Sequence, residues 1–170
     1  MRIALVGYMG CGKTSLGQQL SEKIAKPFID LDQWIEESEG LKIAELFATK
    51  GENYFRVKES EALKQVLQTH QTLILATGGG TPCFFNNMYI LNESCKTVYL
   101  QCSPKKLLER ISSDKNIRPL LSSANFDLID HLLQREPHYL QSQYILNGDQ
   151  TFSELIDDLQ HLSQSQQTGF

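Results

Sequence analysis

Gly7-Tyr-Met-Gly-Cys-Gly-Lys-Thr14 is the stretch of sequence that decides the fold. It fits the pattern G-x-x-x-x-G-K-[ST], which describes a phosphate-binding loop. Glycines let the backbone curl until several N–H groups point at phosphate oxygens, and the following helix adds its positive dipole end. The lysine can reach the β- and γ-phosphates, and the threonine hydroxyl can sit on a magnesium ion. The stretch therefore predicts a nucleotide-binding loop.

The residues on either side of this loop supply the setting that the motif requires. Arg2–Val6 is a short apolar run, suited to a buried strand. Thr14–Ala25 has the pattern of a helix, with Leu16, Leu20 and Ile24 at four-residue spacing. A strand, a glycine loop and a helix thus follow one another, which favours nucleotide binding over an incidental glycine turn.

The composition of the whole chain limits the class of protein. Its 170 residues are 41% hydrophobic and 21% charged, as in ordinary soluble proteins, and they fit one domain spanning residues 1–170. A net charge of −4 argues against nucleic acid as the main partner. No apolar run approaches the length of a membrane span, and a strand beginning at Arg2 leaves no room for a signal peptide. We expect a cytoplasmic protein without membrane contact.

The cysteines and histidines do not indicate a metal site. The four cysteines lack C-x-x-C spacing and the four histidines are scattered. Cys11 lies inside the glycine loop, where a helix N-terminus can lower the pKa of a thiol. A small side chain that the loop merely tolerates is the simpler interpretation.

Apolar runs alternate with helical stretches along the chain, which predicts an α/β fold: a parallel sheet of five strands between two layers of helices. The expected strands are Arg2–Val6, Pro27–Ile29, Thr72–Ala76, Lys96–Gln101 and Tyr144–Leu146. The expected helices are Thr14–Ala25, Pro104–Ser112, Phe126–Gln141 and Phe152–Leu162, together with a helical insertion at residues 32–70, broken near Gly40 and Gly51. Residues 112–125 are polar and predict a lid, and residues 163–170 predict a frayed tail.

Asp30-Leu-Asp32 follows the second strand, at the edge of the sheet where ligands bind. If the segment stays extended, both carboxylates project the same way. One could then hold a magnesium-bound water while the other orients or deprotonates a hydroxyl. A helix N-cap followed by an acid in the first turn explains the same residues. The spacing leaves both interpretations open.

Further candidates are arginines and glycines. Arg56 and Glu59 stand three apart on a predicted helix, which favours an exposed ion pair when taken alone. Gly78-Gly-Gly80 is costly to order, so a group that approaches the backbone closely is expected there. Arg118 in the lid and Arg135 could stabilise phosphoryl charge or bind a carboxylate, although each, taken singly, is typical of a surface arginine.

In this order, the elements resemble the shikimate kinase family, from Arg2 to about Tyr144. The phosphate loop is similar down to its Met-Gly pair, and Asp30–Asp32 matches the D-x-D motif of the family. The other matching segments are Ile43–Phe47, Gly51–Glu59, Gly78–Gly80, Arg118–Leu121 and Arg135 with Tyr139. Cys11 departs from the family, which more often has serine or alanine there.

The resemblance implies a P-loop NTPase fold and transfer of the γ-phosphoryl group of ATP to the 3-hydroxyl of shikimate, by a monomer that uses Mg²⁺. Thr14 and Asp30 would hold the metal, and Lys13, Asp32 and Arg118 would be catalytic. ATP would contact Gly10, Cys11, Gly12, Lys13, Thr14, Ser15, Arg110 and Arg118, with Arg110 beside the adenine. Shikimate would contact Asp32, Arg56, Gly79 and Arg135.

Two rival interpretations remain. Another small-molecule kinase of the same fold, acting on gluconate or a nucleoside monophosphate, would share the phosphate loop and lid. It would not need Asp32, Arg56, Gly79 and Arg135 together. A nucleotide-dependent regulatory protein that has lost catalysis would bind ATP without turnover, although Lys13, Thr14 and Asp32 are all present.

Overall fold

Five parallel strands form the centre of the computed structural model, which describes residues 1–113 and 127–165. Their order across the sheet is β2-β3-β1-β4-β5. The strands are β1 (Arg2–Val6), β2 (Phe28–Asp30), β3 (Leu73–Ala76), β4 (Lys96–Gln101) and β5 (Tyr144–Asn147). Because all four pairings are parallel, the carboxyl ends of the strands share one edge of the sheet, where ligands of such folds bind.

The middle of the sheet is apolar on both faces. Ile3 in β1 pairs with Ile74 in β3 and with Lys96 in β4. Residues 3–6 and 73–75 are fully buried, as expected for strands covered on both sides. The predicted bounds of β1 and β4 are confirmed, those of β3 and β5 differ by one residue at one end, and β2 is shifted by one residue at both ends.

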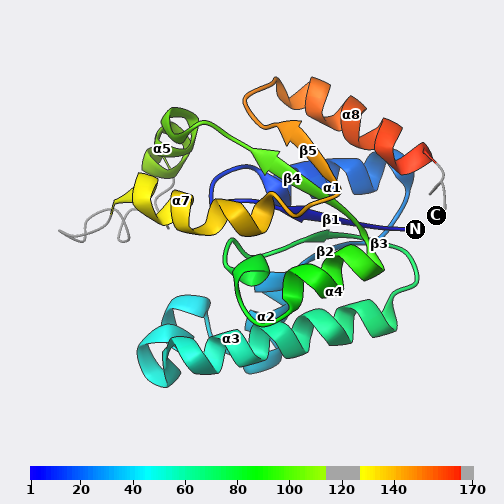
Figure 1. The fold of residues 1–170 in the computed structure, drawn as a ribbon. Helices are drawn as coiled ribbons and strands as arrows, with labels where there is room; N and C mark the ends of the chain where they lie inside the picture. The colour runs from blue at the N-terminus through cyan, green and yellow to red at the C-terminus, as the bar shows by residue number, and fades with distance from the viewer. Residues whose placement is uncertain (114–126, 166–170) are drawn as a thin grey trace.

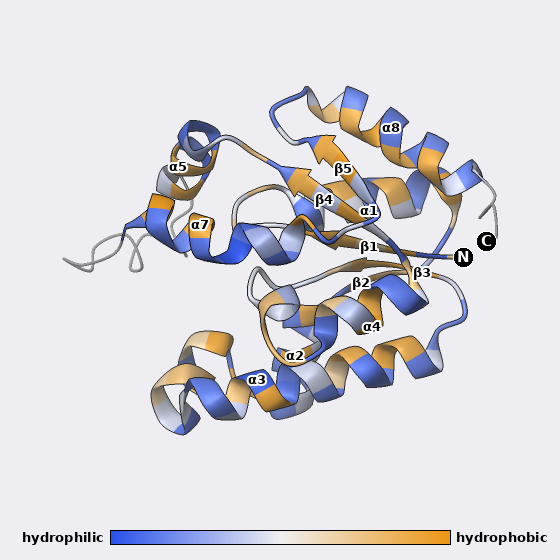
Figure 2. Cartoon of the chain, viewed as in Figure 1, coloured by the Kyte–Doolittle hydropathy of each residue, from blue (hydrophilic) through white to orange (hydrophobic). Residues whose placement is uncertain are grey.

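Helices cover both faces of the sheet (Figure 1). On one face lie α1 (Lys13–Ile24) and α8 (Phe152–Gln164), which pack on each other, and the other face carries α3 (Ile43–Thr69), α4 (Asn87–Ser94) and α7 (Leu128–Tyr139). The remaining elements are α2 (Leu31–Glu39), η1 (Thr81–Cys83) and α5 (Pro104–Ser113). The strands are apolar, whereas the helices carry hydrophobic and hydrophilic residues in alternating patches (Figure 2). The predicted three-layer α/β fold is confirmed.

The helical segment expected at residues 32–70 contains both predicted breaks. Gly40 ends α2 in a left-handed conformation with φ 67°. Gly51 interrupts α3 with φ 81° and ψ 168°, a combination that is essentially restricted to glycine. Helix α3 packs against α2, α4 and η1, so the segment forms part of the helical layer on this face of the sheet.

Three parts of the chain differ from the predictions or lie beyond them. Neither η1 nor α4, between β3 and β4, was predicted from the sequence. Helix α8 continues to Gln164, two residues past its predicted end and into the segment expected to be frayed. Ser112 and Ser113 end α5, but the rest of the predicted lid, including Arg118, lies outside the described residues. Among those residues, none of the helices is both long and apolar enough to span a membrane.

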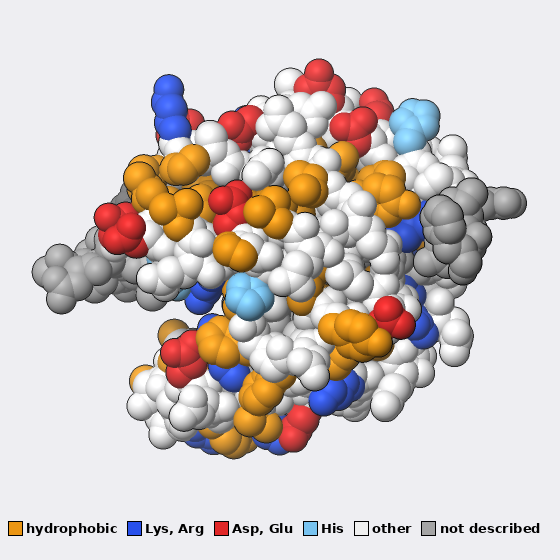
Figure 3. Space-filling view, in the orientation of Figure 1, with side chains coloured by type: hydrophobic (Ala, Val, Ile, Leu, Met, Phe, Trp, Pro, Cys, Tyr) orange, Lys and Arg blue, Asp and Glu red, His pale blue; other side chains and the backbone are white. Residues whose placement is uncertain are grey.

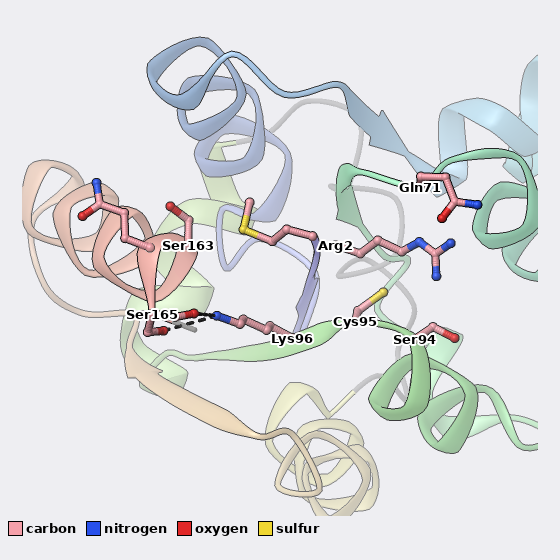
Figure 4. Close-up of a pocket in the computed structure, with 9 residues that line it drawn as sticks. Arg2, Gln71, Ser94, Cys95, Lys96, Ser163 and Ser165 are labelled. Atoms are coloured by element: carbon pink, nitrogen blue, oxygen red, sulfur yellow. Dashed lines mark hydrogen bonds between the residues drawn. The ribbon is translucent and has the colours of Figure 1, made fainter. Parts of the chain in front are cut away.

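Lys96 anchors the end of α8 at the amino-terminal edge of the sheet, beside a cavity of about 410 Å³ (Figure 4). Its buried ammonium donates to the Leu162 carbonyl at 2.9 Å, to the Ser165 carbonyl and to Ser165 Oγ at 3.2 Å. A cation at a helix C-terminus satisfies carbonyls that have no partner within the helix and opposes the negative end of its dipole. Lys96 therefore fixes α8 against the sheet.

Candidate active site

The loop between β1 and α1 has the backbone of a phosphate cradle. Gly7, Gly10 and Gly12 have φ values of 141°, 78° and 99°, which side chains rarely permit. A Cβ on Gly10 would also lie 2.8 Å from Ile111 Cγ1. Gly12 caps α1 without a side-chain hydrogen bond to the first turn. The amides at the start of α1 are therefore left for an anion.

The loop binds its own lysine. Lys13 Nζ donates to the carbonyls of Gly7 and Tyr8 at 2.8 and 2.9 Å and lies 3.6 Å from Cys11 Sγ. These contacts hold the ammonium over the loop. The Cys11 side chain is buried and does not line the nucleotide cleft. This favours the interpretation that the loop merely tolerates its thiol.

Asp30 joins the phosphate loop to the second strand. Thr14 Oγ1 donates to Asp30 Oδ2 at 2.6 Å. The other carboxylate oxygen accepts from the backbone N–H groups of Asp32 and Gln33 at 3.0 and 3.3 Å. Asp30 is thus the N-cap of α2 while it also contacts the loop.

Asp32 lies in the first turn of α2, so the interpretation in which both acids belong to an extended segment is wrong. The chain turns helical at once because Asp30 caps the helix. Burial, together with the nearby carboxylates of Asp30 and Glu59, raises the pKa of the Asp32 carboxyl to about 7, while Lys13 and Arg56 act in the opposite direction. A carboxyl group in this environment can take up a proton near neutral pH.

The three glycines after β3 are required by what surrounds them. A Cβ on Gly78 would lie 2.6 Å from Asp32 Oδ1, and one on Gly80 would lie 2.3 Å from Arg56 Nη1. At Gly79 a Cβ would lie 3.3 Å from the Met9 backbone nitrogen and 3.7 Å from Arg135 Nη1. The predicted close approach to this backbone is confirmed, and the approaching groups are charged side chains from α2, α3 and α7.

Arg56 is the best-enclosed cation of this region. It donates to Glu59 Oε2 at 2.9 Å and to Glu52 Oε1 at 3.1 and 3.2 Å, and its guanidinium lies 4.1 Å from the centre of the Phe84 ring. The side chains of Arg56 and Glu59 are 8% and 1% exposed. The expectation of an exposed ion pair is therefore wrong, because the kinked α3 turns this face toward η1. Glu59 also accepts from Thr81 Oγ1 at 2.6 Å.

Helix α7 brings Arg135 to the same loop. Tyr139, one turn further along, donates its hydroxyl to the Gly79 carbonyl at 2.6 Å and packs on the Tyr99 ring. Arg135 thereby lies beside the triple glycine, across from Arg56. The molecular surface is hollowed between α7 and the first part of α3 (Figure 3).

A cleft of about 510 Å³ opens over the phosphate loop. It is lined by Met9, Gly10, Gly12, Lys13, Thr14, Ser15, Asp30, Asp32, Thr77, Gly79, Arg110 and Phe152. Arg110 donates to the Cys11 carbonyl at 3.0 Å, which places it beside the phosphate loop; its contact with the adenine stays a prediction. Phe152 was not anticipated because it belongs to no motif and only the fold brings the start of α8 to this cleft. Arg56 and Arg135 do not line this cleft; they approach Gly80 and Gly79 from α3 and α7.

The phosphate loop and the order of the sheet define a P-loop nucleotide-binding fold. Deoxyadenosine kinase from M. mycoides shares this fold at 16% identity, with a TM-score of 0.64 over 97% of this chain and 100% of the other. A family model described as shikimate kinase matches residues 9–163. The chain belongs to the shikimate kinase family.

Individual relatives are similar over nearly the whole chain. A shikimate kinase from Bacteroides thetaiotaomicron is 43% identical over 155 residues, which cover 88% of each chain. A crystal structure of shikimate kinase from that organism has a TM-score of 0.89 at 38% identity and covers 97% of this chain and 99% of its own. Shikimate kinase from Acinetobacter baumannii, solved in complex with shikimate, has a TM-score of 0.88 at 34% identity, covering 99% and 95%.

Proposed function

We propose that this protein transfers the γ-phosphoryl group of ATP to the 3-hydroxyl of shikimate, giving ADP and shikimate 3-phosphate in aromatic amino acid biosynthesis. One observation carries the assignment to this chain's own residues. Asp32, Arg56 and Arg135 converge on the side-chainless loop Gly78–Gly80 next to the phosphate loop. An acid with two arginines suits a small carboxylate that bears neighbouring hydroxyls.

On the nucleotide side, the loop amides and Lys13 bind the phosphates, and Arg110 flanks the adenine. Thr14 and Asp30 fit a magnesium ion, since a hydroxyl and a carboxylate are oxygen ligands and Mg²⁺ needs few protein ligands beside phosphates and water. When bound, the ion neutralises charge on the β- and γ-phosphates. Arg118 would add positive charge over the phosphates; its assignment depends on the family resemblance.

On the acceptor side, Arg56 and Arg135 bind the carboxylate of shikimate, and the Gly79 N–H contributes a hydrogen bond. Glu59 holds Arg56 in place from behind at 2.9 Å. Asp32 accepts a hydrogen bond from the reacting hydroxyl and removes its proton as the new P–O bond forms. The raised pKa of Asp32, about 7, suits this role, because a base works best when its pKa lies near the working pH.

The cellular context is part of the same proposal. We expect a cytoplasmic monomer whose partners are ATP and shikimate, with no nucleic acid or membrane among them. Residues 1–170 form one kinase domain with a substrate-binding insertion at 32–70 and a lid at 112–125. Sedimentation of the pure protein measures the oligomeric state directly.

The test is release of ADP from Mg-ATP with shikimate, compared with gluconate, nucleoside monophosphates and no acceptor. Stimulation by shikimate alone supports the proposal. Turnover with another acceptor would reassign the acceptor site, and ATP binding without turnover on any of them would leave a regulatory protein. Omission of Mg²⁺ is expected to abolish the stimulated rate.

A further inference from the structure

A tyrosine of the phosphate loop is hydrogen-bonded to a histidine of α7. Tyr8 Oη lies 2.6 Å from His131 Nδ1, and the two rings meet edge to face with centroids 5.5 Å apart. Tyr8 is only 1% exposed, and its carbonyl accepts from Lys13. The contact therefore ties the residue that turns the loop to a helix more than a hundred positions later.

His131 shares a face of α7 with two residues of the acceptor side. His131, Arg135 and Tyr139 are spaced four apart, so they follow one another along one side of the helix. The first bonds to the phosphate loop, and the last donates to the Gly79 carbonyl at 2.6 Å. Arg135 stands between these two attachments. A rotation of α7 about its axis would break both.

We propose that Tyr8 and His131 are positioning residues that set the distance of Arg135 from the phosphate loop, and so the acceptor's carboxylate relative to the transferred phosphoryl group. The inference rests on the proposed function. Neither side chain needs to touch a substrate. Misplacement of a binding group by about 1 Å is enough to lower rates strongly.

The direction of the hydrogen bond follows from the charge of its surroundings. Burial raises the pKa of Tyr8 to about 12, so the phenol keeps its proton and donates. Burial also lowers the pKa of His131. The nearby cations Arg135 and Arg56 lower this pKa as well, whereas Glu52 acts in the opposite direction. A neutral imidazole that accepts at Nδ1 is consistent with both shifts.

Four variants test the proposal in steady-state kinetics. Tyr8→Phe removes the donor, and His131→Leu removes the acceptor. Each should raise the KM for shikimate about three- to tenfold, as expected for loss of one buried hydrogen bond, while the KM for ATP changes little. His131→Asn, whose Oδ1 can replace Nδ1, should recover most of the acceptor affinity. Leu133→Ala, on the exposed side of the same helix, is the matched control.

The double variant separates positioning from general loss of packing. If the two residues act through one bond, Tyr8→Phe combined with His131→Leu should raise the KM no more than either change alone. Additive effects, or a fall in melting temperature with an unchanged KM for shikimate, would overturn the proposal. So would an equal loss in His131→Asn and His131→Leu.

A second readout does not depend on turnover. The imidazole nitrogen shifts of His131, measured by NMR in the full-length protein, should report a neutral ring with a hydrogen-bonded Nδ1 that changes in Tyr8→Phe. If wild-type protein shows this signature but does not turn over shikimate, the proposed function fails while the contact stands. If the signature does not respond to Tyr8→Phe, the positioning proposal fails.

Discussion

Asp32 combines a useful chemical property with a cost in stability. Its pKa of about 7 means that the folded protein holds this proton more tightly than the unfolded chain does. The contribution of the carboxyl to stability is therefore fully present only below its ordinary pKa near 3.8. It is lost as the pH rises through the folded value. The site thus keeps an ionisable acid where the fold alone would favour a neutral side chain.

The first prediction concerns Asp32→Asn. The variant should lose turnover while it still binds ATP. Its free energy of unfolding relative to wild type should rise by on the order of 1–3 kcal/mol between pH 5 and pH 8, because asparagine never ionises. Chemical denaturation at both pH values measures this change. In wild type, the rate should rise with pH through about 7.

Asp149→Asn provides the opposite case. The Asp149 carboxyl accepts from Ser103, which lowers its pKa, so ionisation favours the fold and the variant should gain nothing at pH 8. If the difference in free energy of unfolding between Asp32→Asn and wild type were the same at pH 5 and pH 8, the raised pKa of Asp32 would be contradicted. A near-normal kcat in the variant would rule out Asp32 as the base.

The second prediction concerns Gly80→Ala. Gly80 has φ −89° and ψ −18°, which alanine adopts easily, so only the added methyl group matters. Because that Cβ would lie 2.3 Å from Arg56 Nη1, the guanidinium must move. We expect the KM for shikimate to rise at least about tenfold with an unchanged KM for ATP. Gly40→Asn is the control, since nothing lies within 4 Å of its Cβ position; equal effects of the two would contradict the steric argument.

At the scale of the elements, α2, α7 and α8 are each fixed near one end by a polar side-chain contact. Asp30 caps α2, and Tyr139 ties α7 to the triple glycine. Lys96 holds the C-terminal carbonyls of α8 from inside the molecule. Such contacts matter most where water cannot replace a lost partner.

The third prediction compares two lysines that bind α8. Lys96→Met should lower the free energy of unfolding by about 1–3 kcal/mol because it removes the buried ammonium that donates to the Leu162 and Ser165 carbonyls. Lys23→Met removes only the exposed ion pair with Asp157, whose side chains are 38% and 57% exposed, and should cost under about 1 kcal/mol. Urea denaturation measures both. A similar loss of free energy of unfolding in the two variants would contradict the role of burial. Neither variant should change the KM for ATP or for shikimate.

The elements that sequence predicted well are those with a strong local pattern. Apolar runs located all five strands, and periodicity located α1, α5 and α8. Helix α4 was missed because it has eight residues and its N-cap Asn86 makes no side-chain hydrogen bond. Arg56 and Glu59 were noticed as a pair, but nothing local distinguishes a buried pair from an exposed one. Similarly, Gly78–Gly80 predicted a close neighbour without identifying Asp32, Arg56 and Arg135, because chain folding alone brings these together.

At the scale of the whole molecule, the proposed sites for the two substrates belong to different parts of the chain. The phosphate loop and Asp30 belong to the ends of β1 and β2, whereas the acceptor side is built from α3, η1 and α7. They meet at Gly79, which lines the nucleotide cleft and lies beside Arg135. A substitution in the acceptor site can therefore abolish binding there while the nucleotide site still binds its ligand.

The fourth prediction uses this separation. Mg-ATP and shikimate should each raise the melting temperature of the wild-type protein by mass action. Arg56→Ala should lower the melting temperature of the ligand-free protein, because Glu59 stays buried without its cation. It should also abolish the shift caused by shikimate while keeping the shift caused by nucleotide. Lys58→Ala, which removes a partly exposed ion pair with Glu61, should keep both shifts. A persistent shikimate shift in Arg56→Ala would remove Arg56 from the acceptor site.

The bare backbone at Gly79 has a consequence for the design of inhibitors. Gly79 lines the nucleotide cleft and adds no side chain of its own between the cleft and Arg135, whose Nη1 lies 3.7 Å from the position of a Cβ there, so a nucleotide analogue and a carboxylate mimic can be joined by a linker of only a few atoms. The second half of such a tethered compound binds at the high effective concentration that a short connection creates. A kinase with a bulkier residue at this position would exclude the compound by collision with its linker.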